Sequence, residues 1–179
     1  DAHGERALLQ EVRDAVGSRV WPVHRLDKGT SGVLVLVLAL DLRAARTLAA
    51  AFATGAVTKH YLALVRGWPP LAGRIEHALA PRDDDAEDMP DVARRAAAHA
   101  AVTDFVRLAT VALPVHVDRY PETRYALLDV RPRTGRRHQI RRHLKHIAHP
   151  VLGDATFGKG VHNRFVAGRT GSTRMQPQA

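Results

Sequence analysis

The feature that most constrains the fold is the continuous apolar run VLVLVL at residues 33–38, which directly follows the charged turn HRLDKGTSG at residues 24–32. Such a run of β-branched residues and leucines is typical of a strand buried on both faces of a sheet, and it is too short to cross a membrane. The turn carries one carboxylate, Asp27, between the cations Arg25 and Lys28. Because a rigid scaffold can present a reactive group at such a turn, we predict that Asp27 is reactive.

Further elements follow from the hydrophobic pattern. Helical spacing predicts a helix over residues 5–16 and another from an N-cap at Asp41 to a stop at Gly55. Strand character recurs at residues 57–65, 101–111 and 124–130. We therefore predict one α+β domain over residues 1–179, with a mixed, mostly antiparallel sheet and flanking helices.

Charge is unevenly distributed along the chain. The formal net charge is +9, which favours a polyanionic partner such as a nucleic acid. Six of the 18 acidic residues lie within residues 83–91, so we predict an acidic surface loop at about 82–99. The absence of cysteine excludes thiol catalysis, disulfides and cysteine-based zinc sites. With neither a signal peptide nor a membrane span in the sequence, we expect a cytoplasmic protein.

The most basic segment is residues 131–149, which hold six arginines, one lysine, four histidines and no acid. We predict a helix that begins at Thr134 or Gly135 and ends before Pro150. Its apolar stripe consists of Ile140, Leu144 and Ile147.

A second side of this helix is expected to be cationic, with Arg137, Arg141 and Lys145 at helical spacing. Arginine forks bind phosphates and carboxylates bidentately, which suits that side to either partner. Gln139 has three interpretations: a contact with a base edge, a hydrogen bond to the backbone, or a polar surface position.

Four segments in this order resemble the RluA-type pseudouridine synthases over nearly the whole chain. They are HRLD with TSG at 24–32, KHY at 59–61, TGRRHQIR at 134–141 and PVLGD at 150–154. Further residues, between Leu108 and Leu144, resemble the members of the family that modify tRNA. Family members usually extend beyond both ends of this chain, so the resemblance implies the pseudouridine synthase catalytic-domain fold, truncated at both ends.

The resemblance implies that a uridine in RNA, with tRNA favoured over rRNA, is flipped out and isomerised to pseudouridine. It implies no cofactor and no metal. Asp27 would be the catalytic group, acting as nucleophile or base, and Arg141 would pair with it. Tyr61 would stack on the uracil, and Arg25 would fill the gap left by the flipped base. Contacts with RNA are expected for Lys28, Arg136 and Arg137, and His24 would either contact RNA or brace the turn.

Two other functions stay open at this point. The first is a non-catalytic RNA-binding relative, or an inactive fragment of such an enzyme. The second is a metal-dependent nuclease that uses the aspartates between Asp83 and Asp91. For the enzyme we expect a monomer without a membrane partner.

Overall fold

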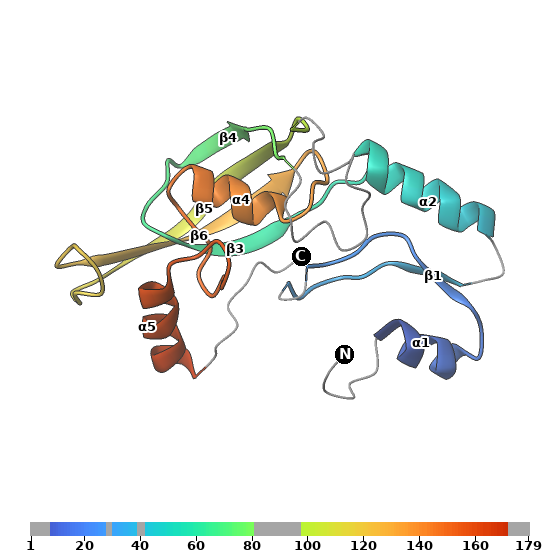
Figure 1. Cartoon of the computed structure of the whole chain (residues 1–179), viewed down its shortest axis with the longest axis horizontal. Coiled ribbons are helices and arrows are strands. Elements are labelled where there is room, and N and C mark those ends of the chain that lie inside the picture. Colours follow the sequence, from blue (N-terminus) through green and yellow to red (C-terminus); the bar gives the residue numbers. More distant parts are fainter. Residues whose placement is uncertain (1–7, 28–29, 39–41, 81–97, 172–179) are drawn as a thin grey trace.

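The computed structural model describes residues 8–27, 30–38, 42–80 and 98–171. Its main body is a four-stranded sheet in the order β3-β6-β5-β4, and every pairing in it is antiparallel. The strands are β3 (Tyr61–Arg66), β4 (Ala72–Glu76), β5 (Val102–Leu113) and β6 (Thr123–Pro132). The predicted α+β class with a mostly antiparallel sheet is therefore confirmed (Figure 1).

Two helices cover parts of the sheet. Helix α4 (Gln139–His146) lies across one face, where its Ile140 and Leu144 join the core formed by residues such as Ala63 and Leu128 (Figure 1). Helix α5 (Gly160–Thr170) contributes to a second cluster of Tyr125, Leu152 and Val166. The predicted apolar stripe of the basic segment is thus confirmed, since Ile147 also packs against the main core.

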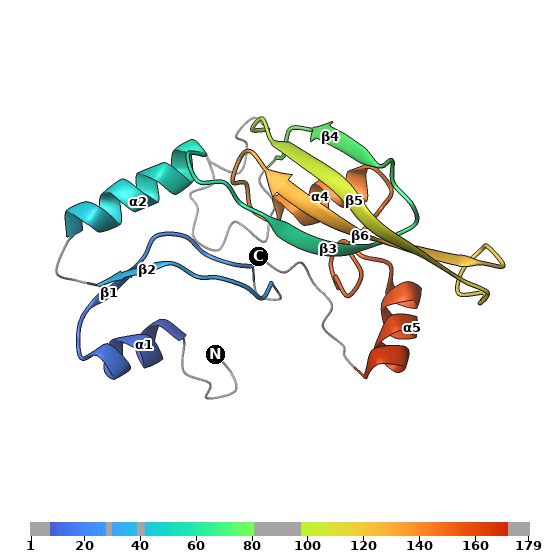
Figure 2. The ribbon, with the colours of Figure 1, turned by 180° about the vertical axis from the view of Figure 1, so that it is seen from behind.

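The N-terminal elements form a separate group beside β3 (Figures 1 and 2). They are α1 (Leu8–Val16), β1 (Val20–Pro22), β2 (Leu36–Leu38) and α2 (Leu42–Thr54). Both helices occupy the predicted positions and end before glycines of positive φ, Gly17 at 60° and Gly55 at 78°. The predicted N-cap Asp41 lies outside the described residues.

The interpretation of residues 33–38 as a strand buried on both faces is wrong. Only Leu36–Leu38 is strand, and within the described residues its sole partner is β1. Val33 is 71% exposed. The ribbon has only two strands, so an apolar run within it is covered less completely than a central strand of a larger sheet.

The helix of the basic segment begins later than predicted, at Gln139 rather than Thr134 or Gly135. His138 adopts left-handed backbone angles (φ 54°, ψ 26°), a conformation through which a right-handed helix cannot propagate. The strand predicted from residue 57 likewise begins at Tyr61, whereas β5 and β6 run slightly beyond their predicted ends. The predicted acidic loop lies largely outside the described residues, which resume with an isolated bridge between Leu79 and His99.

Candidate active site

A cavity of about 440 Å³ opens between the N-terminal group and the main sheet. Its walls come from residues 23–27 and Thr30, from α2, from the start of β3 and from the loop that leads into α4. Five cationic side chains line it, those of Arg25, Lys59, Arg136, Arg137 and Arg141. Among the described residues, Asp27 is the one acid in this lining.

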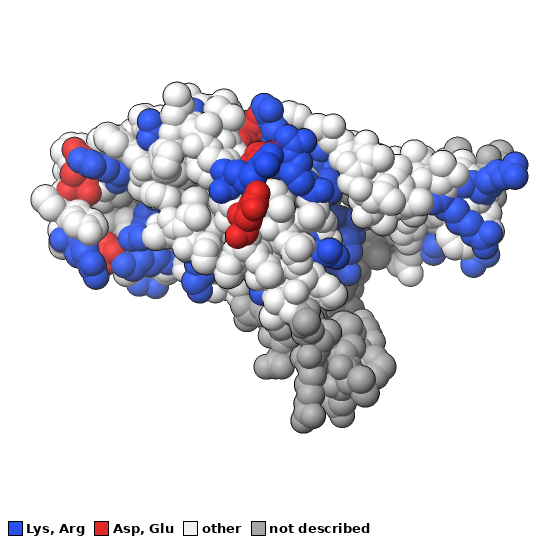
Figure 3. All heavy atoms as spheres, turned by 90° about the horizontal axis from the view of Figure 1, so that it is seen from above, with Lys and Arg blue, Asp and Glu red and all other residues white. Residues whose placement is uncertain are grey.

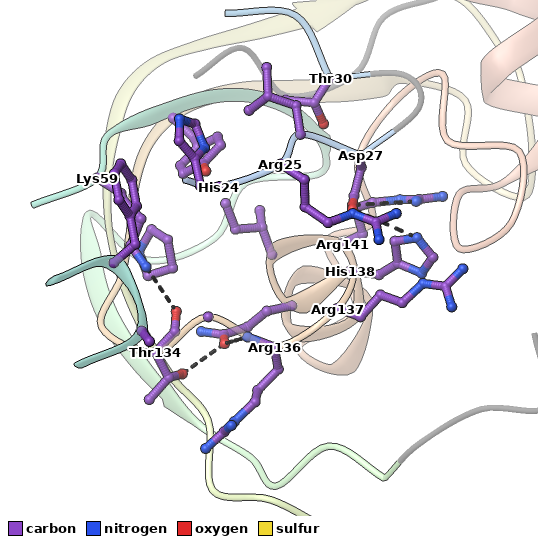
Figure 4. Close-up of a pocket in the computed structure, with 18 of the residues that line it drawn as sticks. His24, Arg25, Asp27, Thr30, Lys59, Thr134, Arg136, Arg137, His138 and Arg141 are labelled. Carbon is purple, nitrogen blue, oxygen red and sulfur yellow. Dashed lines mark hydrogen bonds and ion pairs between the residues drawn. The ribbon is translucent and has the colours of Figure 1, made fainter. Parts of the chain in front are cut away.

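Asp27 and Arg141 meet at one end of this cavity. Arg141 Nη1 lies 3.6 Å from the Asp27 carboxylate, and His138 Nε2 lies 3.8 Å from it. Figure 4 shows Arg25 at this same end, whereas His24 and Lys59 stand at the other. The sequence motifs predicted the Asp27–Arg141 pair but indicated no role for His138, which reaches the carboxylate because its left-handed backbone turns the chain just before α4.

A second carboxylate holds Arg141 in place. The fully buried Asp154 accepts hydrogen bonds from Arg141 Nε at 2.7 Å and from Arg141 Nη2 at 2.8 Å. It also accepts hydrogen bonds from the backbone N–H groups of Thr156 and Phe157, each at 2.9 Å. Burial favours a higher pKa for Asp154, but these hydrogen bonds outweigh it and lower the pKa.

Of the two kinds of partner expected for the cationic side of the basic helix, Arg141 has carboxylates, but it is buried and does not form an exposed basic surface. Arg141 is buried at 8% exposure, and its pKa is raised, chiefly by the hydrogen bonds to Asp154. Arg137 precedes the helix, and of the three predicted cations only Lys145 is exposed on α4 itself. Because the buried guanidinium of Arg141 pairs with two carboxylates, its role is to orient the site and not to attract phosphates.

Tyr61 and Lys59 line the cavity from the start of β3. The half-buried hydroxyl of Tyr61 has a raised pKa, because burial disfavours the phenolate and the negative charge of Asp27 adds to the effect. This hydroxyl therefore stays protonated at neutral pH. Burial lowers the pKa of Lys59, whose Nζ lies 3.5 Å from the backbone oxygen of Thr134. The structure thus places Tyr61 in the same cavity as Asp27 and Arg141.

His24 braces the turn. Its Nε2 accepts a hydrogen bond of 2.9 Å from the backbone N–H of Val35, and its ring stacks on Phe52 with 4.4 Å between centroids. Burial lowers the pKa of His24, in keeping with a neutral ring that accepts this bond. The backbone N–H of Thr30 donates to the backbone oxygen of Asp27 at 2.8 Å and closes the turn.

The remaining predicted site residues lie on the rim. Arg25, Arg136 and Arg137 are exposed and line the cavity, and Lys28 lies outside the described residues. Gln139 is buried, and its side-chain amide donates to the backbone oxygen of Val102 at 2.9 Å. Of its three interpretations, the backbone hydrogen bond is the one confirmed.

Two classes of site can be assessed only for part of the chain. Within the described residues, no group of three or more His, Cys, Asp or Glu side chains could hold a metal ion. The aspartates between Asp83 and Asp91 lie outside those residues. None of the helices in the described ranges is long and apolar enough to span a membrane.

Comparison with known proteins places these features in a family context. The sequence profile described as RNA pseudouridylate synthase matches residues 2–146. The tRNA pseudouridine synthase C of Pasteurella multocida (strain Pm70) is 41% identical over 179 residues, which cover 100% of this chain and 72% of that relative. The enzyme of the same name from Vibrio cholerae (serotype O1, strain ATCC 39315 / El Tor Inaba N16961) is 39% identical over 184 residues, with the same two coverages.

Solved structures agree with the sequence comparison. Human RNA pseudouridylate synthase domain containing 1 superposes with a TM-score of 0.70 and 29% identity, over 97% of this chain and 66% of that one. Human RNA pseudouridylate synthase domain containing 4 gives a TM-score of 0.63 and 25% identity, over 96% of this chain and 69% of that one. The fold around the cavity is therefore shared with proteins of this class.

Proposed function

The chain belongs to the RNA pseudouridylate synthase family, and on that premise we propose that it converts a specific uridine of tRNA to pseudouridine, with Asp27 as the catalytic group. The bacterial relatives named for tRNA support this substrate over rRNA. The observation that carries the proposal is the convergence of Asp27, Arg141 and Tyr61 on one cationic cavity.

The reaction breaks the C1′–N1 bond of the nucleotide, turns the uracil and joins C1′ to C5. The hydrogen on C5 leaves as a proton and N1 gains a proton, so atoms balance without an oxidant or reductant. Asp27 acts either as a nucleophile at C1′ or as a base at the C2′ proton, and both roles require an ionised carboxylate beside the sugar. The guanidinium of Arg141 lies 3.6 Å from this carboxylate.

The target uridine must leave its helix to reach this carboxylate, at a cost of about a few kcal/mol. Contacts of the phosphate backbone with Arg136, Arg137 and Lys28 offset this cost. The ring of Tyr61 stacks on the extruded uracil, and the exposed Arg25 occupies the space that the base vacates. The protonated hydroxyl of Tyr61 keeps a second negative charge away from Asp27.

The test uses tRNA transcripts that carry tritium at C5 of uracil, because each turnover releases that hydrogen to water. Asp27→Asn removes the charge and keeps the shape, so we expect the rate to fall by at least about 10²–10⁴-fold. Filter binding should show tRNA affinity within about threefold of the wild type, since a carboxylate contributes no attraction to phosphates. Asp104→Asn, on β5 outside the cavity lining, is the matched control for the substitution.

Continued tritium release by Asp27→Asn would sink the catalytic assignment. A wild-type chain that binds tRNA but releases no tritium would instead support the alternative of a non-catalytic RNA-binding relative.

We further propose that the chain works as a monomer in the cytoplasm. Light scattering of the purified protein should give a mass near 19.6 kDa. A stable dimer in that measurement would contradict the monomer proposal.

A further inference from the structure

A second cavity of about 430 Å³ lies at the opposite end of β3. It is enclosed by the residues that follow β3, by the tip of the β5–β6 hairpin and by the segment that follows α4. This volume falls in the range of small-ligand sites in proteins. None of its lining residues belongs to the cavity that holds Asp27.

Two aromatic side chains stand partly open to solvent at this second cavity. Tyr120 on the hairpin tip is 60% exposed, and Trp68 is 39% exposed. Trp68 is fixed in its orientation, because its Nε1 donates to the backbone oxygens of Val111 at 3.3 Å and Tyr125 at 3.1 Å. The Arg124 guanidinium lies 4.5 Å from the centre of the Trp68 ring. The cavity therefore presents flat aromatic and guanidinium surfaces held by the fold.

The opposite wall is also rigid. His149 Nδ1 donates to the backbone oxygen of Arg66 at 2.8 Å. The ring of His149 packs so closely on Gly67 that a Cβ there would lie 2.9 Å from Nδ1, and Gly67 has a φ of 78°. Only glycine accommodates both this approach and this backbone angle, so the wall depends on that residue.

The charges in the second cavity are balanced, unlike those in the first. Asp118 pairs with Arg66 at 3.7 Å and also with Lys159. Glu122 accepts a hydrogen bond of 2.6 Å from Arg124 Nε. Figure 3 shows basic and acidic side chains gathered together at the hairpin end of the molecule. A phosphate would meet two carboxylates here, so a neutral planar group is the better ligand.

We propose that this second cavity binds an unpaired nucleobase of the same RNA whose uridine enters the first cavity. Nucleobases are planar and uncharged, and they stack on aromatic rings and on guanidinium planes. The inference rests on the proposed function for the identity of the RNA. It adds a recognition contact remote from the reacting nucleotide.

The spacing suits one RNA molecule. Tyr61 lines the first cavity and Arg66 the second, at the two ends of β3. At about 3.3 Å per strand residue these positions are roughly 17 Å apart. That distance corresponds to about five stacked nucleotides at about 3.4 Å each. In a strand whose bases stay stacked, the second cavity would therefore read a base about five nucleotides from the target uridine, and fewer in a more extended strand.

The kinetic test compares full-length tRNA with a hairpin that holds the target uridine but is too short to reach the second cavity. Tyr120→Ala should raise KM for tRNA about tenfold, the low end of what one stacked base contributes. It should also remove the preference of the enzyme for tRNA over the hairpin. Tyr120→Phe retains the ring and should restore both values. Because Tyr120 is exposed, its truncation leaves the fold intact, which a urea melt verifies.

A binding test reports on the cavity without turnover. In a Trp21→Phe, Asp27→Asn background Trp68 is the single tryptophan, and saturating tRNA should quench its fluorescence by stacking. The short RNA hairpin should not quench the fluorescence of Trp68. An unchanged KM in Tyr120→Ala, equal losses on tRNA and hairpin, or unquenched fluorescence would each overturn the proposal. Quenching by tRNA in that background, together with a chain of unchanged sequence that releases no tritium from tRNA, would leave this site standing and reject the proposed function alone.

Discussion

The guanidinium of Arg141 is held by the buried carboxylate of Asp154 through two hydrogen bonds, of 2.7 and 2.8 Å. Its remaining Nη1 points to Asp27, at the longer distance of 3.6 Å. Asp154 therefore orients the arginine before any substrate arrives, while Asp27 keeps room for a reacting sugar. Asp154 is therefore a positioning residue for the proposed reaction. Substitution of Asp154 or Arg141 tests this role directly.

Asp154→Asn should destabilise the protein by about 3 kcal/mol, because it leaves the buried charge of Arg141 without its closest counter-ion. Urea denaturation at pH 7.5 measures the change. Glu76→Gln is the control, since the Glu76 side chain is 66% exposed and its ion pair with Arg74 is screened by solvent. Equal effects of the two substitutions would show that Asp154 is not an essential partner of Arg141.

Arg141→Lys retains the positive charge but loses the fork that contacts two carboxylates at once. We expect pseudouridine formation to fall about a hundredfold, in the general range for a lost charge-positioning group. The tritium-release assay measures this rate. Arg74→Lys makes the same exchange at a side chain that is 56% exposed and outside the cavity. If lysine at 141 supports the normal rate, the fork geometry is irrelevant to catalysis.

Stability should fall as the pH drops below about 6.5, and the fully buried His143 is one cause. Its Nδ1 lies 2.9 Å from Thr103 Oγ1, and its Nε2 lies 3.0 Å from the backbone oxygen of His77. Burial lowers the pKa of His143 below its ordinary value of 6.5, although the bond to His77 opposes the shift. The unfolded chain therefore takes up a proton at a pH where the folded chain does not.

The direction of the pH effect on stability follows from this difference in proton uptake between the unfolded and the folded chain. The stability contributed by neutral His143 is fully present above pH 6.5 and is lost as the pH falls toward the folded pKa. Each such histidine adds a slope of up to about 1.4 kcal/mol per pH unit. Urea melts at pH 7.5 and pH 5.0 should show the loss, and His143→Gln should reduce it. A free energy of unfolding that is equal at both values of pH would contradict this account.

Two glycine substitutions should act in opposite directions. A Cβ at Gly158 would lie 2.3 Å from the backbone oxygen of Asp154, so Gly158→Ala must distort the turn that holds this carboxylate. We expect a loss of at least about 2 kcal/mol and a lower rate. Gly168 in α5 has nothing within 4 Å of an added Cβ, so Gly168→Ala should stabilise the helix by about 0.5–1 kcal/mol. Thermal melts of both variants provide the measurement.

The sequence by itself was sufficient for much of the fold and for the candidate site. The strand patterns at 101–111 and 124–130 predicted β5 and β6 because alternation with a buried face is a local property. The apolar stripe of α4 was predicted for the same reason. The motif order named Asp27, Tyr61 and Arg141 as neighbours, and all three line one cavity.

Tertiary structure alone decided which partners these residues have. Residues 33–38 carry a pattern suited to a buried strand, yet burial depends on whether other layers cover it, and Val33 is 71% exposed. The helical spacing of Arg141 was compatible with either a phosphate or a carboxylate partner, and only the packed structure shows that Asp154, 13 residues away, accepts two of its hydrogen bonds. Trp68 and Tyr120 both line the second cavity, and no local sequence pattern predicts that they lie close together. Periodicity reports the environment of one segment, whereas ion pairs and cavities arise from distant segments that meet only when the chain packs.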